Sequence, residues 1–108
     1  FLALTPSQIT SDQNDYSGWT ASQNGVNIRA STDASRNVTG LSAGQNGQFH
    51  YIWNVGSNNL VLQHENASST AANRMICSTG SDLTINANKC AFIMYDSTST
   101  RWRVTLLP

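Results

Sequence analysis

The feature that most constrains this chain is the alternation of apolar and polar side chains in segment 101–106. Trp102 and Val104 fall on one side of an extended backbone there, and the arginines between and before them fall on the other. A period of two residues is typical of a strand whose sheet has one face on the core and one face in solvent. The apolar segment 90–95 precedes it, and the polar residues 96–100 between them are typical of a turn. The segments 90–95 and 101–106 are therefore predicted to be adjacent antiparallel strands.

Similar short segments, separated by Gly, Asn, Asp and Ser, recur along the whole chain. Turn signals at roughly 8–12-residue spacing indicate a β-sandwich or related all-β fold. We therefore expect an all-β, antiparallel β-sandwich or jelly roll of about eight short strands, with at most one short helical turn at 66–73. The length predicts a single domain, 1–108, in which residues 1–8 form an N-terminal arm or linker. The expected strands are 25–31, 38–41, 48–55, 60–65, 74–77, 83–85, 90–95 and 101–106.

The strongest strand signal lies at 48–55, where the aromatic residues share one side of the strand. The loop 56–59 offers Gly and Asn, which tolerate the backbone of tight turns, so 48–55 and 60–65 are predicted to pair as a hairpin. The large odd-numbered side chains of 48–55 are assigned to the core or to a subunit interface. The side chains expected to be mainly buried are Phe49, Tyr51, Trp53, Val55, Phe92, Met94, Trp102 and Val104.

Composition narrows the classes of partner. Ser, Thr, Asn and Gln account for 43 of 108 residues, whereas charged residues make up 11% and the formal net charge is zero. The few cations are scattered, which argues against a nucleic-acid partner, and no apolar run is long enough for membrane insertion. A neutral surface gains little charge repulsion, which favours a subunit of an assembly. The first residue, Phe1, indicates a processed product or a piece of a longer chain.

No catalytic motif stands out. The chain lacks a nucleophile elbow, a phosphate-binding loop and a dinucleotide fingerprint. His50 and His64 flank the predicted hairpin and could lie across from each other near Glu65, but no third ligand follows at metal-binding spacing, so surface histidines are favoured. Cys77 and Cys90 are interpreted as small buried hydrophobic residues rather than as a disulfide. We expect no catalytic residues, no metal, no cofactor and no enzymatic activity.

A sugar-binding site is the one ligand site that the sequence allows us to place. Loops at one end of a sandwich carry function while strands are committed to pairing and packing. Tyr16 and Trp19 lie in a loop-rich region and could stack on a sugar ring, and planar amides and carboxylates match sugar hydroxyls. The same residues are also ordinary turn formers. The candidates for hydrogen bonds to a glycan are Asp12, Asn14, Asn46, Asn58 and Asn59.

Five stretches in this order resemble a recurrent module of tailed-bacteriophage virion proteins, found in fibre-like and in small capsid-associated proteins. They are 9–16 (ITSDQNDY), 28–41 (IRASTDASRNVTGL), 54–62 (NVGSNNLVL), 65–74 (ENASSTAANR) and 95–103 (YDSTSTRWR). The resemblance implies a small β domain on the virion surface, often trimeric, and it supplies no catalytic residues to carry over. The two cysteines and the cluster FHYIW at 49–53 look like local departures.

These observations leave three hypotheses of function. The first is a non-enzymatic bacteriophage structural module, a trimeric fibre or appendage domain that contacts the host surface. The second is a capsid decoration protein that stabilises the head, and the third is a small glycan-active enzyme, for which no motif speaks. The partners expected are further copies of the chain in a homotrimer, other virion proteins and a host-surface glycan. The expected location is the virion surface, after assembly in the host cytoplasm.

Overall fold

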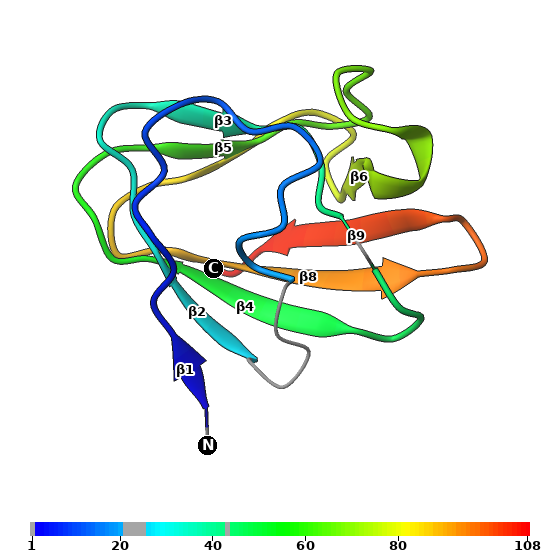
Figure 1. The fold of residues 1–108 in the computed structure, drawn as a ribbon, viewed down its shortest axis with the longest axis horizontal. Helices are drawn as coiled ribbons and strands as arrows, with labels where there is room; N and C mark the ends of the chain where they lie inside the picture. The colour runs from blue at the N-terminus through cyan, green and yellow to red at the C-terminus, as the bar shows by residue number, and fades with distance from the viewer. Residues whose placement is uncertain (1, 21–25, 43) are drawn as a thin grey trace.

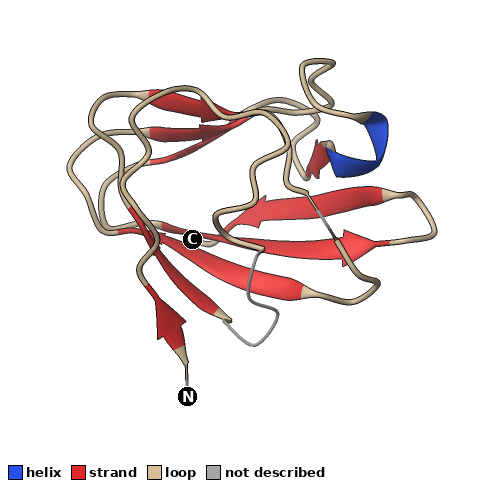
Figure 2. Ribbon diagram, in the orientation of Figure 1, coloured by secondary structure: helices blue, strands red, loops and turns tan. Residues whose placement is uncertain are grey.

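The computed structural model describes residues 2–20, 26–42 and 44–108, and it shows two β-sheets that face each other (Figure 1). The larger sheet has six strands in the order β1 (Ala3–Leu4), β2 (Asn27–Ala30), β4 (Phe49–Asn54), β8 (Cys90–Asp96), β9 (Arg101–Leu106) and β6 (Met75–Cys77). The smaller sheet has three strands in the order β3 (Arg36–Val38), β5 (Leu60–Leu62) and β7 (Leu83–Ile85). The described helical structure is one short 3₁₀ turn, η1 (Ala71–Asn73), drawn in blue in Figure 2. The predicted all-β sandwich is therefore confirmed.

The direction of the strands differs from the prediction. β1, β2 and β4 run parallel to one another, as do β3 and β5, and β6 runs parallel to β9. Leu4 pairs with Ile28 and Ile28 with Ile52, a step of 24 residues, and Val38 pairs with Leu62 at the same step. The first half of the chain thus winds between the two sheets like a short solenoid. The prediction of a purely antiparallel sandwich was wrong, and a jelly roll is not confirmed. Alternation with a period of two shows which residues share a face of the strand, but it does not show the direction of the neighbouring strand.

The predicted hairpin at 56–59 was also wrong. β4 lies in the six-stranded sheet between β2 and β8, whereas β5 lies in the three-stranded sheet between β3 and β7. The intervening loop carries the chain from one sheet to the other (Figure 1). Gly and Asn residues permit such a corner as readily as a hairpin turn, so the loop sequence does not distinguish the two.

The core lies between the sheets, on the even-numbered side of β4. His50, Ile52 and Asn54 are fully buried there, beside Ile28 and Ala30 of β2. Burial is confirmed for two of the residues expected in the core, Trp102 and Val104. The prediction was wrong for Phe49, Trp53 and Val55, which are exposed, whereas Tyr51, Phe92 and Met94 are partly buried. The second sheet covers the opposite side of β4, so the aromatic side was left outward.

The remaining strands agree with the prediction only in part, because β3 covers Arg36–Val38 instead of 38–41 and β5 (Leu60–Leu62) is shorter than the predicted 60–65. β7 and β9 have the predicted bounds, and β8 is one residue longer than predicted. The strand predicted at 25–31 begins at Gly25, which lies outside the described ranges. In the described part of the chain, no helix has the length and apolar character needed to cross a membrane.

Candidate functional site

The outward side of the six-stranded sheet is the most unusual surface of the molecule. We call it the outer apolar face and define it by Phe49, Tyr51, Trp53, Val55, Phe92 and Met94. Alternation along β4 and β8 places these side chains on one side, and the antiparallel register sets Phe49 opposite Met94 and Tyr51 opposite Phe92. Phe49, Trp53 and Val55 are each more than 40% exposed. Large contiguous apolar surface of this kind usually marks an interaction site.

Three aromatic rings at the centre of this face contact one another. The ring centres of Tyr51 and Phe92 are 5.2 Å apart, those of Phe49 and Phe92 are 5.8 Å apart, and Phe49 meets Tyr51 nearly edge to face at 6.4 Å. These distances lie in the range that aromatic pairs prefer. The three rings therefore form one packed aromatic cluster on the outward side of the sheet.

Two hollows flank these rings. One, of about 400 Å³, lies over β1, β2 and β4 and contains Trp53 and Arg29; its further lining residues are Leu2, Ala3, Asn27 and Val55. The other, of about 300 Å³, lies over β6, β8 and β9 and contains Met94 and Arg103; its further lining residues are Ile76, Ser78, Phe92, Val104 and Thr105. Neither lining includes a carboxylate or a histidine, so the hollows suit apolar burial better than acid–base chemistry.

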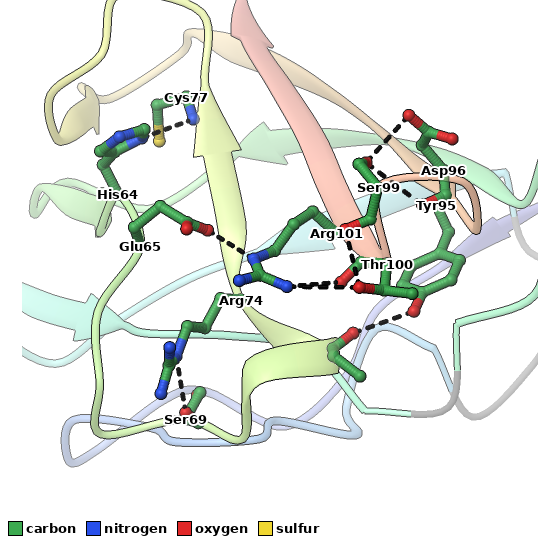
Figure 3. A network of polar contacts seen from close by, with 11 residues as sticks. His64, Glu65, Ser69, Arg74, Cys77, Tyr95, Asp96, Ser99, Thr100 and Arg101 are labelled. Atoms are coloured by element: carbon green, nitrogen blue, oxygen red, sulfur yellow. Dashed lines mark hydrogen bonds and ion pairs between the residues drawn. The ribbon is translucent and has the colours of Figure 1, made fainter.

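A group of polar residues lies beside η1 and the β8–β9 turn (Figure 3). Arg101 Nε donates to Glu65 Oε1 at 2.6 Å, and Tyr95 Oη donates to the carbonyl of Ala72 at 3.0 Å. Arg74 Nε donates to the carbonyl of Ser69 at 3.0 Å. These bonds join the 64–74 connection to the end of the six-stranded sheet.

The residue types in this group resemble catalytic ones, but their contacts are structural. His64 Nδ1 accepts the backbone N–H of Cys77 at 3.0 Å, and Ser99 Oγ donates to Asp96 Oδ2 at 2.9 Å. Burial raises the pKa of the Cys77 thiol to about 11, with a further contribution from nearby Asp82, which keeps it in the unreactive neutral form. Among the described residues, no group of three His, Cys, Asp or Glu side chains is placed to hold a metal ion.

The two histidines do not face each other. His50 is fully buried in β4, where its Nε2 lies 3.0 Å from Gln48 Nε2, whereas His64 follows β5 of the other sheet. The expectation that both lie at the surface was wrong for His50, because the even-numbered side of β4 faces the core. Cys77 and Cys90 are both buried and free, which confirms the interpretation as small hydrophobic residues.

The two aromatic candidates for sugar stacking pack against each other. Trp19 is 1% exposed, and Tyr16 is half-buried with its ring edge-on to Trp19 at 5.4 Å. The prediction that Trp19 offers a surface ring was wrong, because its loop folds over the core. Burial raises the pKa of the Tyr16 hydroxyl.

Four of the five polar candidates use their side chains to hold loops together. Asp12 Oδ1 accepts the backbone N–H of Asn37 at 2.9 Å, Asn14 Oδ1 accepts from Thr39 Oγ1 at 2.7 Å, and Asn46 Oδ1 accepts the N–H of Ser97 at 3.1 Å. Asn58 Nδ2 donates to the carbonyl of Thr32 at 3.1 Å. The side chain of Asn59 is exposed. Their role in glycan binding stays a prediction.

The sequence thus pointed to the loops, while the most distinctive surface is formed by strands. The sequence did contain a signal for the outer apolar face, namely the large odd-numbered side chains of β4, which were assigned to the core or to a subunit interface. Only the position of the second sheet separates these two readings.

Residues 9–103, nearly the whole chain, match a family described as the phage depolymerase C-terminal beta sandwich domain. No curated protein matches the chain significantly. No solved structure does so either.

Proposed function

This chain belongs to the family of phage depolymerase C-terminal beta sandwich domains, and from that premise we propose that it is a homotrimeric, non-enzymatic module of a virion appendage that contacts the host surface. The observation that carries the proposal is the family match, which spans residues 9–103. The family description identifies a bacteriophage virion β-module, and it names the C-terminal sandwich of a depolymerase. We therefore place the module in a tail appendage.

The polar contacts of the described residues support a non-enzymatic role. Ser99 bonds to a carboxylate rather than to a histidine, and His64 accepts a backbone N–H. The hydrogen bond from Ser99, with further bonds from the Thr98 N–H and from Arg103, lowers the pKa of the Asp96 carboxyl, which makes Asp96 a poor general base for activating Ser99. Incubation of the purified domain with host capsular polysaccharide should release no new reducing ends. Release that survives removal of contaminating enzymes would overturn this part of the proposal.

The exposure of the outer apolar face supports assembly. A single 11.7 kDa domain with such a face in water gains free energy by burying it against another protein surface. The number of copies proposed follows the resemblance to trimeric virion modules, so sedimentation equilibrium should give three times the mass of the chain. A stable monomer across the accessible concentration range would refute the homotrimer.

The position on the particle separates the appendage from the head. Gold-labelled antibodies against the domain should decorate tail appendages in electron micrographs of intact phage. Label spread over the capsid would instead favour a decoration protein.

Contact with the host is tested by binding of the fluorescent domain to host cells, which should exceed binding to cells stripped of surface polysaccharide.

A further inference from the structure

The larger of the two hollows lies at the β1 end of the six-stranded sheet, where β1, β2 and β4 run side by side (Figure 1). The parallel register sets Arg29 beside Trp53, and it sets Asn27 between Ala3 and Tyr51. Residues paired across neighbouring strands project from the same face of a sheet. The side chains of Arg29, Asn27 and Trp53 therefore rise together on the outward side. Ala3 adds only a methyl group on the edge strand, which leaves room beside Asn27.

The lining of this hollow has the composition of a small-ligand site. Leu2, Trp53 and Val55 provide apolar walls and are each more than 40% exposed, while Arg29 and Asn27 supply the polar groups. Ligand pockets are typically about 300–1,000 Å³ in volume and mostly apolar, with a few polar groups that orient the ligand. At about 400 Å³, the hollow lies in the lower part of this range and suits a small cyclic group.

Arg29 is the arginine that the fold does not use. The side chains of Arg36, Arg101 and Arg103 each pair with a carboxylate, at 2.6–3.3 Å. Arg74 donates to a backbone carbonyl at 3.0 Å. Within the described ranges, no hydrogen bond or ion pair engages the side chain of Arg29, which is exposed. Its guanidinium group is therefore available to an anion from outside the chain.

The second hollow lacks this combination. Its cation, Arg103, lies 3.3 Å from Asp96 Oδ2, so an anionic ligand would have to displace a carboxylate of the chain. Its lining contains Phe92 and Met94 but no tryptophan. Of the two hollows, the one beside Trp53 suits an anionic ligand, and the other provides a matched control.

The groups around Arg29 indicate the class of anion. The guanidinium of arginine is a planar fork that binds a carboxylate through two parallel hydrogen bonds. The exposed indole of Trp53 offers a flat platform for the apolar face of a sugar ring. The Asn27 amide offers donors and an acceptor to sugar hydroxyls. Among the described residues that line the hollow, none carries a negative charge that would repel the anion.

We propose that the hollow formed by Arg29, Trp53 and Asn27 binds an acidic sugar residue, a pyranose with a carboxylate, of a host-surface glycan. The carboxylate pairs with Arg29, the apolar face of the ring lies on Trp53, and a hydroxyl bonds to Asn27. This proposal rests on the host contact proposed above and adds the site and the class of glycan. The three contacting rings over β4 and β8 do not line this hollow, so they remain available for assembly.

The chain carries its own reporter of this site. Trp53 is 42% exposed, whereas the other two tryptophans, Trp19 and Trp102, are buried in the core. Oligosaccharides of galacturonic acid and of glucuronic acid should therefore reduce the quenching of tryptophan fluorescence by acrylamide. Their methyl esters keep the sugar ring and lose the charge, so they should bind at least about tenfold more weakly.

A matched pair of variants locates the site. Arg29→Gln removes the unpaired cation of the first hollow, and Arg103→Gln removes the paired cation of the second. Both side chains are exposed, so both variants should fold, which circular dichroism checks. The two changes alter the net charge equally, so a difference between them reports position. Calorimetric titration with the acidic oligosaccharides should show a loss of affinity of at least about tenfold for Arg29→Gln and less than about twofold for Arg103→Gln.

Three results would overturn the acidic-sugar site: no binding of either acidic oligosaccharide at millimolar concentration, equal affinity for the methyl esters, or equal losses in the two variants. Displacement of the sugar by an equal concentration of acetate would show a simple anion site and would also overturn it.

The host-cell assay separates this proposal from the proposed function. If the unaltered chain binds host cells and Arg29→Gln binds them equally well, host contact stands and this site is wrong. If the acidic oligosaccharides bind through Arg29 but the chain does not bind host cells, the site stands and host contact is wrong.

Discussion

Replacing Asn54 by leucine should destabilise the protein by about 2–5 kcal/mol, because its amide holds the corner between the sheets. Asn54 is fully buried. Its Nδ2 donates to the carbonyls of Ile85 and Asn58, each at 2.8 Å, and its Oδ1 accepts the N–H of Gly56 at 3.1 Å. Three neutral hydrogen bonds of about 0.5–1.5 kcal/mol each are lost, and leaving the buried carbonyl of Ile85 without this donor moves the total toward the upper end of that sum.

The isosteric change Asn54→Asp gives a sharper test, because it adds a pH dependence. The introduced carboxylate would face two carbonyl oxygens in a buried site, so its pKa should be raised above the unfolded value of about 3.9. The folded state then binds more protons than the unfolded state, and stability falls as pH rises from about 4 until the folded pKa is passed. The loss should approach about 1.4 kcal/mol per pH unit in that window.

Urea unfolding followed by circular dichroism, at one fixed protein concentration and at pH 4.5 and 7.5, measures both effects. Asn59→Asp is the matched control, since this asparagine lies in the same loop with an exposed side chain, and it should change stability little at either pH. A loss below about 1 kcal/mol for Asn54→Leu would show that this amide does not hold the corner. An Asn54→Asp penalty that is equal at the two pH values would refute burial of the site.

Three further predictions concern single groups. Trp102→Phe should cost about 1–3 kcal/mol in urea unfolding, because the buried indole N–H donates to a backbone carbonyl at 2.9 Å. The Cys77 thiol, with a pKa of about 11 and 2% exposure, should not react with a disulfide reagent at pH 8 until urea unfolds the chain; fast reaction in the native state would contradict its burial. Hydrogen bonds from Asn73 and Thr70 lower the pKa of the Asp15 carboxyl below its unfolded value of about 3.8. The ionised carboxyl therefore stabilises the fold above pH 3.8, and this stability is lost as the pH falls through the folded pKa. Asp15→Asn should therefore lose less stability on acidification than the unaltered chain.

The sequence by itself determined that the chain is all-β and where most of the strands lie. β7 and β9 were predicted with their observed bounds, because alternation and turn residues are local signals. The order of five short stretches also pointed to a phage virion module, which the family match confirms. No active-site motif was needed for that conclusion.

Only the tertiary structure decided which side of β4 faces the core. Both sides of this strand carry apolar residues, Ile52 on one and Phe49 and Trp53 on the other, and a period of two does not rank the sides. The second sheet covers Ile52, and so the larger side chains remain outside. Strand direction and the corner at Asn54 were also beyond the sequence, since parallel and antiparallel strands share one alternation. The same holds for the candidate site: its aromatic side chains are exposed because the second sheet covers the other side of β4.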